Sequence, residues 1–572
     1  MVNGEVVIRV AGSAGDGVAS VGDTISKLAS RSGLGVCAYN SYQSVIRGGF
    51  VWLQIRVSND KVYTHGDNPH ILVPLNQSEY ERHKDSVLPG GVIVYNEDKV
   101  KVSEKRDDIN YVGLSLRKLA PEQAKQPIMQ NTLLLGAVVK IVGFNKDLLE
   151  DIIKKSFGKK GEEIAKANID VVNAGYNATD LVHDFGIRTQ NKKYYVITGN
   201  YAVATGAAIG GCKFYSAYPM TPATSILHWF ASNGKKYGIV VKQLEDEIAV
   251  VNAAIGAGFA GVRAMCATSG GGFSLMTEAI GSAGMTETPV VIINSMRGGP
   301  STGLPTKTEQ ADLFQALGAS QGEYPKAILA PKDPVSAFYM SAEALNIAEK
   351  YQMPVILLID FLLSNGYYGI PIEELDPSKI KIERGHVLTS VNGEYHRYKY
   401  TDTGVSPRVI PGTPNAYYVA ATDEHDETGI LISDVFTDET KRKKMMEKRM
   451  RKMNYVVEDF KLPLVEGDDN PDLTIVGWGS TYGAIKEASN ILRREGVKVS
   501  HVHVEYLFPV KKEIADILSK HRNVVIVENN YTSQYSKLLR METGYSINKK
   551  VLKYDGEPFT PLYLVNELKK YL

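Results

Sequence analysis

The chain has 572 residues, a length that predicts about three to four domains. Its hydrophobic content of 44% and charged content of 23% are typical of a soluble globular protein, and its net charge of +1 gives no electrostatic reason to expect binding to nucleic acid or to an anionic membrane. No apolar run approaches the ~18 residues that a membrane span needs, and the first residues show no signal-peptide pattern, so we expect a cytoplasmic protein.

The three cysteines, Cys37, Cys212 and Cys266, lie far apart in the sequence. No pair has the CxxC spacing, so neither a disulfide framework nor an iron–sulfur site is predicted in this chain. We expect all three to be buried as small hydrophobic residues. Residues 424–427, with the sequence EHDE, are adjacent and cannot all converge on one ion, so we predict no metal site.

The N-terminal stretch predicts a strand, a glycine turn and a helix. Residues 5–11 are strand-like, residues 12–17 read GSAGDG, and apolar residues at helical spacing follow. This geometry can cradle a phosphate at a helix N-terminus, but a tight turn without a ligand is an equal alternative. The later Asn40 imitates a magnesium-binding GDG…N pattern. The spacing is too short for that motif and Asp16 lies inside the turn, so we reject a metal here. The polar residues from His183 to Lys193 are typical of a linker, so the first domain is expected to span residues 1–190.

Residues 191–375 alternate between strand and helix, which predicts a doubly wound α/β domain with a parallel sheet. The expected strands are residues 194–198, 262–267, 290–295, 327–330 and 355–358.

Three motifs in this domain are candidates for chemistry. Residues 218–222 read YPMTP, where two prolines prevent a regular element and hold Thr221 on a stiff loop. Residues 243–247 read QLEDE and lead into an apolar, small-residue run that predicts a buried helix. Glu247 directly precedes this run, so of the three acids it is the one that we expect to be buried. A helix-capping role is the alternative. Residues 297–306 read RGGPSTGLPT, in which glycines allow close backbone approach and Arg297 suits a carboxylate ligand. Arg297 as an ordinary loop ion-pair residue, and Thr221 and Thr306 as turn caps, are the alternatives.

The C-terminal third divides into an irregular part and a regular part. Residues 376–465 interrupt the alternation, and the basic run 441–452 is interpreted as a solvated helix face. From residue 466 to 572 the strand–helix pattern returns, with strands expected at 473–477, 497–504 and 524–528. Glu528 ends the last of these, and we interpret it as structural.

The motifs at 218–222, 245–258 and 297–306 resemble the α subunit of the archaeal-type 2-oxoacid:ferredoxin oxidoreductases. Met220 departs from the family's usual isoleucine, a substitution that keeps volume and polarity. Residues 9–57, with Arg47 before two glycines, and the run 131–137 resemble the γ domain of these enzymes, fused ahead of α. The resemblance implies three doubly wound α/β domains: a γ-type domain (1–190), a thiamine pyrimidine-binding domain (191–375) and, after the connecting arm (376–465), a transketolase C-terminal-like domain (466–572).

The resemblance also implies roles for individual residues. Glu247 would hydrogen-bond the aminopyrimidine ring of thiamine diphosphate, and Thr221, Arg297 and Thr306 would line the substrate pocket. We assign Tyr218, Pro219, Ser269 and Gly270 to the cofactor side of the same site. In relatives the γ domain is associated with coenzyme A, but this association does not identify individual contact residues. Arg47 is therefore as consistent with an ion-pair role as with a ligand-binding role.

The implied reaction is coenzyme A-dependent oxidative decarboxylation of 2-oxoacids, pyruvate or 2-oxoglutarate or both, to acyl-CoA and CO2, with electrons passed to ferredoxin. A partner β subunit is expected to carry the diphosphate and Mg2+ site and a 4Fe-4S cluster, in a heterodimer or a dimer of heterodimers. Another thiamine-dependent 2-oxoacid decarboxylase or synthase is the alternative within the enzyme class. From another class, the chain would be a non-catalytic scaffold that binds coenzyme A or a nucleotide.

Overall fold

The structure is a computed structural model that describes residues 4–43, 48–124, 126–432 and 438–572. The chain forms two compact units. The first contains Met1–Thr198 with the later segments Asn365–Leu375 and Thr560–Leu562, and the second contains the remaining residues. Within the described residues there are three sheets of five or more strands, which confirms the predicted α/β class with three domains.

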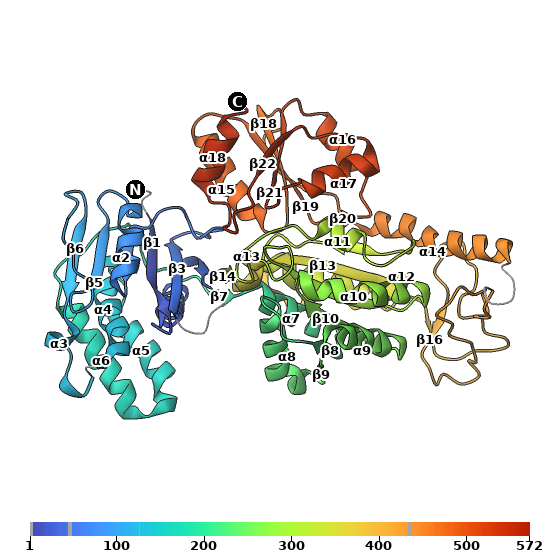
Figure 1. Cartoon of the computed structure of the whole chain (residues 1–572), viewed down its shortest axis with the longest axis horizontal. Coiled ribbons are helices and arrows are strands. Elements are labelled where there is room, and N and C mark those ends of the chain that lie inside the picture. The colour runs from blue at the N-terminus through green and yellow to red at the C-terminus, as the bar shows by residue number, and fades with distance from the viewer. Residues whose placement is uncertain (1–3, 44–47, 125, 433–437) are drawn as a thin grey trace. The chain divides into compact units, whose positions relative to one another are not determined.

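The first unit is built around one mixed eight-stranded sheet (Figure 1). Its strands are β1 (Glu5–Ala14), β2 (Gly35–Ser41), β3 (Gly48–Ser58), β4 (Ile71–Pro74), β5 (Val92–Asn96), β6 (Asn110–Leu114), β7 (Tyr194–Ile197) and β14 (Tyr367–Pro371). The order is β6-β5-β4-β1-β3-β2-β14-β7, with β1, β4, β5 and β6 parallel and β3 antiparallel to β1 and β2. The strand expected at 194–198 therefore pairs, through β14, with the sheet of the first unit.

Six α-helices accompany this sheet within the described residues. They are α1 (Val18–Arg31), α2 (Gln77–His83), α3 (Leu116–Leu119), α4 (Gln130–Val142), α5 (Lys146–Phe157) and α6 (Glu162–Asn177). Glycines let α4 and α6 approach closely, because a Cβ at Gly136 would lie 2.2 Å from the Val172 carbonyl oxygen and one at Gly175 would lie 1.9 Å from that of Leu133.

The second unit contains a seven-stranded sheet with the order β20-β12-β13-β11-β10-β8-β9. Its strands are β8 (Phe214–Ala217), β9 (Val240–Gln243), β10 (Ala264–Thr268), β11 (Val290–Met296), β12 (Ala327–Leu329), β13 (Pro354–Asp360) and β20 (Tyr506–Phe508). All neighbours are parallel except β20, which is antiparallel to β12. Every residue of β10 to β13 is buried, as expected for parallel strands covered on both faces.

The helices connecting these strands cover the sheet (Figure 1). They are α7 (Gly199–Ile209), α8 (Thr224–Tyr237), α9 (Glu247–Phe259), α10 (Gly270–Met285), α11 (Leu313–Leu317), α12 (Pro334–Tyr351) and α13 (Phe361–Asn365).

A five-stranded sheet completes the second unit, in the order β17-β19-β18-β21-β22. Its elements are β17 (Leu464–Gly467), β18 (Leu473–Trp478), α15 (Thr481–Arg494), β19 (Val499–Val504), α16 (Glu513–Ser519), β21 (Val524–Glu528), α17 (Gln534–Thr543), β22 (Lys549–Leu552) and α18 (Pro561–Lys569). One cluster of buried side chains includes Cys266 and Ile328 from the seven-stranded sheet and Trp478 and Ile526 from the five-stranded sheet. These two sheets therefore share a hydrophobic core.

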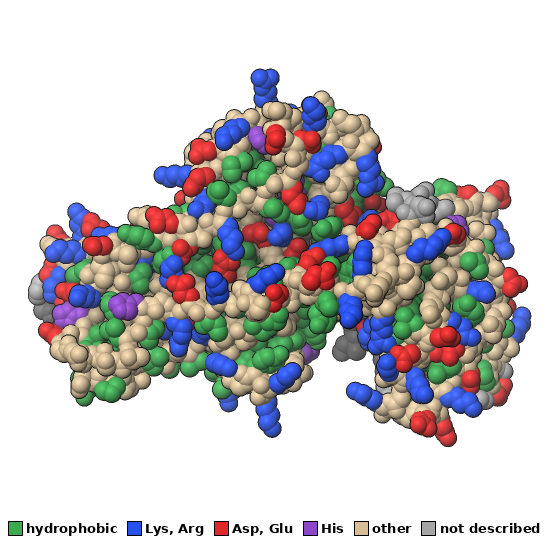
Figure 2. All heavy atoms as spheres, turned by 180° about the vertical axis from the view of Figure 1, so that it is seen from behind, with side chains coloured by type: hydrophobic (Ala, Val, Ile, Leu, Met, Phe, Trp, Pro, Cys, Tyr) green, Lys and Arg blue, Asp and Glu red, His purple; other side chains and the backbone are tan. Residues whose placement is uncertain are grey.

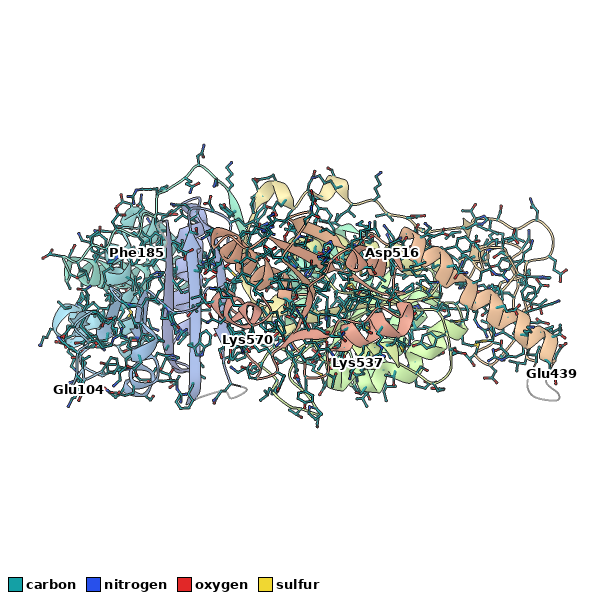
Figure 3. All side chains as sticks on the ribbon, turned by 90° about the horizontal axis from the view of Figure 1, so that it is seen from above. Glu104, Phe185, Glu439, Asp516, Lys537 and Lys570 are labelled. Carbon is teal, nitrogen blue, oxygen red and sulfur yellow. The ribbon has the colours of Figure 1, made fainter. Side chains whose placement is uncertain are left out.

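The connecting arm has little regular structure before its long helix. It contains the short strands β15 (Val387–Leu388) and β16 (Arg408–Val409), and then α14 (Glu439–Asp459), whose first residue is labelled in Figure 3.

The interpretation of the basic run in α14 as a solvated face is wrong for three of its residues, because Lys448, Arg449 and Lys452 are buried. Lys448 Nζ and Lys452 Nζ each lie 2.5 Å from a carboxylate oxygen of the buried Glu287. Burial lowers the pKa of Lys448 to about 7, although the negative charge of Glu287 opposes this shift. These ion pairs attach the arm to the turn between α10 and β11.

Acidic and basic side chains are interspersed over the face drawn in Figure 2. Cys37, Cys212 and Cys266 are buried, as predicted. Across the described residues, no helix combines the length and the apolar character that crossing a membrane requires.

Candidate active site

The predicted functional residues follow the carboxyl ends of adjacent parallel strands. The strands β11, β10, β8 and β9 are neighbours in this order. The segments directly after them carry Arg297, residues 269–272, residues 218–222 and Glu247. Ligand sites of open parallel sheets form at this edge, so the topology alone brings the three sequence motifs together.

The two acids at the start of α9 have separate roles. The Asp246 carboxylate caps the helix by accepting a hydrogen bond of 2.8 Å from the Ala249 backbone N–H. Glu247 is 3% exposed, whereas Glu245 is exposed. Asp246 therefore fills the capping role that was the alternative for Glu247, and Glu247 is the acid that the fold draws inside.

The Glu247 carboxylate lies against the first turn of α10. A Cβ at Gly272 would lie 2.5 Å from Glu247 Oε1 and 2.1 Å from Thr268 Oγ1. Oε1 is buried, and among the described residues it has no hydrogen-bond partner. A buried carboxylate oxygen without a donor is unfavourable by about 1–3 kcal/mol, so this atom is poised to accept a hydrogen bond from a ligand.

Ser269 and Gly270 form the adjoining wall at the N-terminus of α10. Ser269 is fully buried, and its Oγ has no partner within the described part of the chain. A Cβ at Gly270 would lie 2.6 Å from Asp312 Oδ2, which accepts a hydrogen bond of 3.1 Å from Asn294 Nδ2. Burial raises the pKa of Asp312, although Asn294 and the Arg297 charge oppose the shift.

The loop at residues 218–222 connects the Glu247 side of the site to Arg297. Thr268 Oγ1 lies 3.7 Å from Met220 Sδ, and Arg297 Nη1 donates a hydrogen bond of 2.7 Å to the Thr221 carbonyl oxygen. Asn200 Nδ2 holds the end of this loop by donating to the Pro222 carbonyl oxygen at 2.8 Å. Burial lowers the pKa of Arg297, with Asp312 opposing the shift. The guanidinium nevertheless stays charged, because arginine does not deprotonate in proteins.

The Arg297 loop closes on itself. Gly298 and Leu304 form a bridge, in which the Leu304 N–H donates to the Gly298 carbonyl oxygen at 2.8 Å. Gly303 has a φ of 54° and its ideal Cβ would lie 2.1 Å from that same oxygen, so only glycine fits this position. Thr306, at the end of the loop, is 5% exposed.

The structure thus brings together Glu247, Ser269, Gly270, Thr221 and Arg297. Tyr218 and Pro219, at the start of their loop, are exposed. Sequence reasoning missed the contributions of Thr268, Gly272, Asn294 and Asp312. The first two flank Ser269 and Gly270, which were assigned to the cofactor side, whereas Asn294 and Asp312 belong to no motif and meet through the fold.

In the first unit, the N-terminal glycine turn is occupied by its own carboxylate. Asp16 Oδ2 accepts hydrogen bonds from the Ser13 backbone N–H at 2.8 Å and from Asn76 Nδ2 at 3.2 Å. This arrangement favours the tight-turn alternative over a phosphate cradle, since an anion there would meet a carboxylate. Arg47 lies outside the described residues. The described residues contain no group of three His, Cys, Asp or Glu side chains that could hold a metal ion.

Three family models match the chain. One described as pyruvate flavodoxin/ferredoxin oxidoreductase, thiamine diphosphate-binding, matches residues 205–447. A pyruvate ferredoxin/flavodoxin oxidoreductase model matches residues 7–178, and a transketolase C-terminal domain model matches residues 464–534.

Relatives of nearly full length are also found. A 2-oxoacid:ferredoxin oxidoreductase α subunit from Sulfolobus sp. is 32% identical over 96% of this chain and 94% of its own. A 2-oxoglutarate oxidoreductase subunit from Mycobacterium tuberculosis is 33% identical, with 99% and 91% covered. Among solved structures, the 2-oxoglutarate:ferredoxin oxidoreductase from Magnetococcus marinus, with 2-oxoglutarate, coenzyme A and succinyl-CoA bound, has a TM-score of 0.93 at 34% identity and covers 99% of both chains.

The site geometry fits the aminopyrimidine end of thiamine diphosphate. A planar heterocycle with ring N–H and amino donors needs a buried acceptor, and Glu247 Oε1 is such an acceptor. Because Gly272 has no side chain, the Glu247 carboxylate can pack closely on the backbone of α10, and Ser269 Oγ is a second buried polar atom without a partner among the described residues.

Proposed function

The chain belongs to the family of 2-oxoacid:ferredoxin oxidoreductase α subunits, and we propose that it forms, with a partner β subunit, the active site of such an enzyme. The reaction is the coenzyme A-dependent oxidative decarboxylation of a 2-oxoacid, pyruvate or 2-oxoglutarate or both, to acyl-CoA and CO2, with ferredoxin as the electron acceptor. The observation that carries this proposal is the buried Glu247 Oε1, which has no donor among the described residues and packs closely against Gly272.

Glu247 is proposed to hold a proton at the ring nitrogen of the aminopyrimidine. Thiamine diphosphate, when bound, supplies the carbanion that adds to the 2-oxo carbon. A carboxylate in a dry pocket interacts more strongly with that ring nitrogen than one in water, because the local dielectric is low. Burial of Glu247 and the apolar composition of α9 support this role.

Arg297 is proposed to bind the substrate carboxylate. Its Nη1 is anchored on the Thr221 carbonyl oxygen, and a guanidinium has five N–H donors, so the group keeps donors for a bidentate carboxylate. The same contact places the Thr221 backbone beside the guanidinium. We assign to the Thr221 hydroxyl a hydrogen bond to the oxygen that gains charge during the reaction. Thr306 would complete the pocket from the closing end of the loop.

The partner β subunit is proposed to supply the diphosphate and Mg2+ site and a 4Fe-4S cluster. The three cysteines of this chain are buried on separate elements and have no cluster spacing, which supports placing the cluster elsewhere. We expect a cytoplasmic heterodimer or dimer of heterodimers that takes coenzyme A as co-substrate.

The test is reconstitution with the natural partner chain. The complex should contain thiamine diphosphate and an iron–sulfur cluster. It should reduce ferredoxin or a viologen when a 2-oxoacid and coenzyme A are added. This chain alone should neither contain these groups nor reduce the acceptor. Decarboxylation without reduction of the acceptor would instead indicate a non-oxidative thiamine enzyme. A complex that assembles normally but turns over no 2-oxoacid would indicate a scaffold.

A further inference from the structure

The segment that follows the Arg297 loop is a strap clamped by the C-terminal part of the chain. We call residues 305–312 the strap. Its alternate side chains Thr306, Thr308 and Gln310 are 5%, 1% and 0% exposed. These three side chains therefore pack against protein, whereas Lys307, Glu309 and Ala311 between and after them are partly exposed.

Gln310 makes four polar contacts with the C-terminal part of the chain. Its backbone N–H donates to the Asn529 carbonyl oxygen at 2.7 Å, and its Oε1 accepts from the Asn529 N–H at 3.1 Å. Its Nε2 donates to the Trp478 carbonyl oxygen at 2.9 Å, and Asn530 Nδ2 donates to the Gln310 carbonyl oxygen at 3.2 Å. Trp478 is the last residue of β18, and Asn529 and Asn530 directly follow β21, so the C-terminal sheet fixes the course of the strap.

A turn of the C-terminal part reaches the Arg297 loop itself. Thr308 N–H donates to the Gly556 carbonyl oxygen at 3.2 Å, and Glu557 forms an ion pair with Lys307. A Cβ at Gly556 would lie 3.0 Å from Lys307 Cβ and 3.1 Å from Leu304 Cδ1, so the turn packs directly on the end of the loop. We call residues 555–557 the bracing turn.

The loop needs such support. Residues 299–304 are exposed, and Leu304 at their end is 48% exposed. An exposed loop held by few contacts samples many conformations, and each must be given up when the loop binds a ligand. Contacts that restrict the free loop to its binding shape therefore raise affinity without touching the ligand.

We propose that the bracing turn positions the Arg297 loop for the substrate carboxylate, with Glu557 as a positioning residue acting through Lys307. This inference rests on the proposed function, and it assigns the C-terminal domain a part in substrate binding in addition to its part in the core. We expect this partly exposed ion pair to contribute about 0.4–1 kcal/mol, the upper part of the range for such pairs. Its loss therefore corresponds to a change in KM of about two- to fivefold, in the absence of any change in the chemical step.

The experiment uses the assembled enzyme and the variants Glu557→Gln, Lys307→Met and the double variant. Glu557→Gln should raise KM for the 2-oxoacid by about two- to fivefold and leave kcat and KM for coenzyme A unchanged. The double variant should be no worse than the worse single variant, since both remove one interaction. The control is Glu495→Gln, which removes another C-terminal ion pair, to Lys569 at 2.8 Å, away from the strap.

A second measurement does not depend on activity. In the isolated chain, the amides of Gly298, Leu304 and Lys307 are hydrogen-bonded within the loop, and they should exchange with deuterium faster in Glu557→Gln than in the Glu495→Gln control.

The outcomes are separable. Wild-type complex without any 2-oxoacid-dependent turnover would overturn the proposed function itself. Active wild type with an unchanged KM in Glu557→Gln, or with a loss confined to kcat, would overturn the positioning role. Additive single effects in the double variant would likewise show that Glu557 does not act through Lys307.

Discussion

Two buried glutamates in the second unit differ in the number of hydrogen bonds that their carboxylates accept. Glu528, at the end of β21, is fully buried and accepts five hydrogen bonds: from Trp478 Nε1, Asn530 Nδ2, Ser533 Oγ, and the backbone N–H groups of Tyr535 and Ser536. Glu247, at the start of α9, is buried almost as completely, yet its Oε1 accepts none from the described residues. Both lie beside a helix N-terminus, so position alone does not distinguish them.

The two carboxylates differ in whether their own chain supplies hydrogen-bond donors to them. Glu528 is provided for by its own domain, including the first turn of α17, and so contributes to stability. Glu247 packs closely on Gly272 in the first turn of α10, and no donor of the described residues reaches its Oε1. A buried acceptor left open by its own chain is a feature of binding sites, where part of the stability is given up for ligand recognition. The same substitution at the two positions should therefore have opposite consequences.

The largest effect is expected for Glu247→Gln. An amide cannot hold the ring proton as a carboxylate does, so turnover of the reconstituted enzyme should fall by about 10²–10⁴-fold. The thermal unfolding temperature should change little, because no hydrogen bond to Oε1 is lost. The measurements are 2-oxoacid-dependent viologen reduction and a melting curve. The exposed Glu245→Gln is the control and should match wild type in both. Wild-type turnover in Glu247→Gln would remove this residue from the catalytic machinery.

Glu528→Gln should show the reverse pattern. The amide NH2 would face donors, leaving at least two of them without an acceptor. At about 1.5–3 kcal/mol for each hydrogen bond to a charged group, we expect the free energy of unfolding to fall by about 3–6 kcal/mol. Denaturant titration of the chain measures this loss. Activity per folded molecule, measured well below the melting temperature, should stay near wild type. A stable variant would show that the five donors are not needed for folding.

Gly272→Ala tests the close packing of the Glu247 carboxylate on α10. The new methyl group would meet Glu247 Oε1 and Thr268 Oγ1, and both side chains would have to move. We expect the thiamine diphosphate concentration for half-maximal activity to rise about tenfold, which corresponds to about 1.4 kcal/mol. The matched control is Gly271→Ala, one residue earlier and exposed, whose Cβ would meet nothing within 4 Å. Equal effects at 271 and 272 would argue against a specific cradle.

The part of the site that follows strand ends could be predicted from the sequence. Glu247 is recognisable because an uncharged helix of small residues begins directly after it, and residues 218–222 are recognisable because two prolines exclude a regular element. Both signals are local, since they depend on neighbours in the chain. The alternation of strands and helices is local too, and it predicted the parallel sheet around the site.

What could not be predicted depends on contacts between distant segments. The basic run in α14 looks solvated, because the acid that accepts Lys448 and Lys452 is Glu287, more than 150 residues earlier. The strap has no composition signal for its contacts with Trp478 and Asn529. The mixed first sheet arises because β3 inserts antiparallel between β1 and β2, and period-two alternation does not specify the direction of a neighbour.

The smallest expected effect concerns Asp312, a third acid of the second unit, which stands between the two extremes. It accepts one hydrogen bond from Asn294, and burial raises its pKa. When the pKa of a carboxyl is higher in the folded state than in the unfolded state, the folded protein binds the proton more tightly. The protein therefore loses stability as the pH rises from the unfolded-state pKa to the folded-state pKa. Asp312→Asn keeps an acceptor for Asn294 and removes this penalty.

Asp312→Asn should therefore stabilise the chain at neutral pH, by less than about 1 kcal/mol, with the gain vanishing below the ordinary aspartate pKa of about 4. Melting curves of variant and wild type across this pH range measure it. Arg297 stays charged in this variant and loses a negative neighbour, so KM for the anionic 2-oxoacid should fall modestly alongside the gain in stability. A variant that is less stable at neutral pH would group Asp312 with Glu528, as an acid that the fold requires, instead of with Glu247, as one that the fold holds for the site.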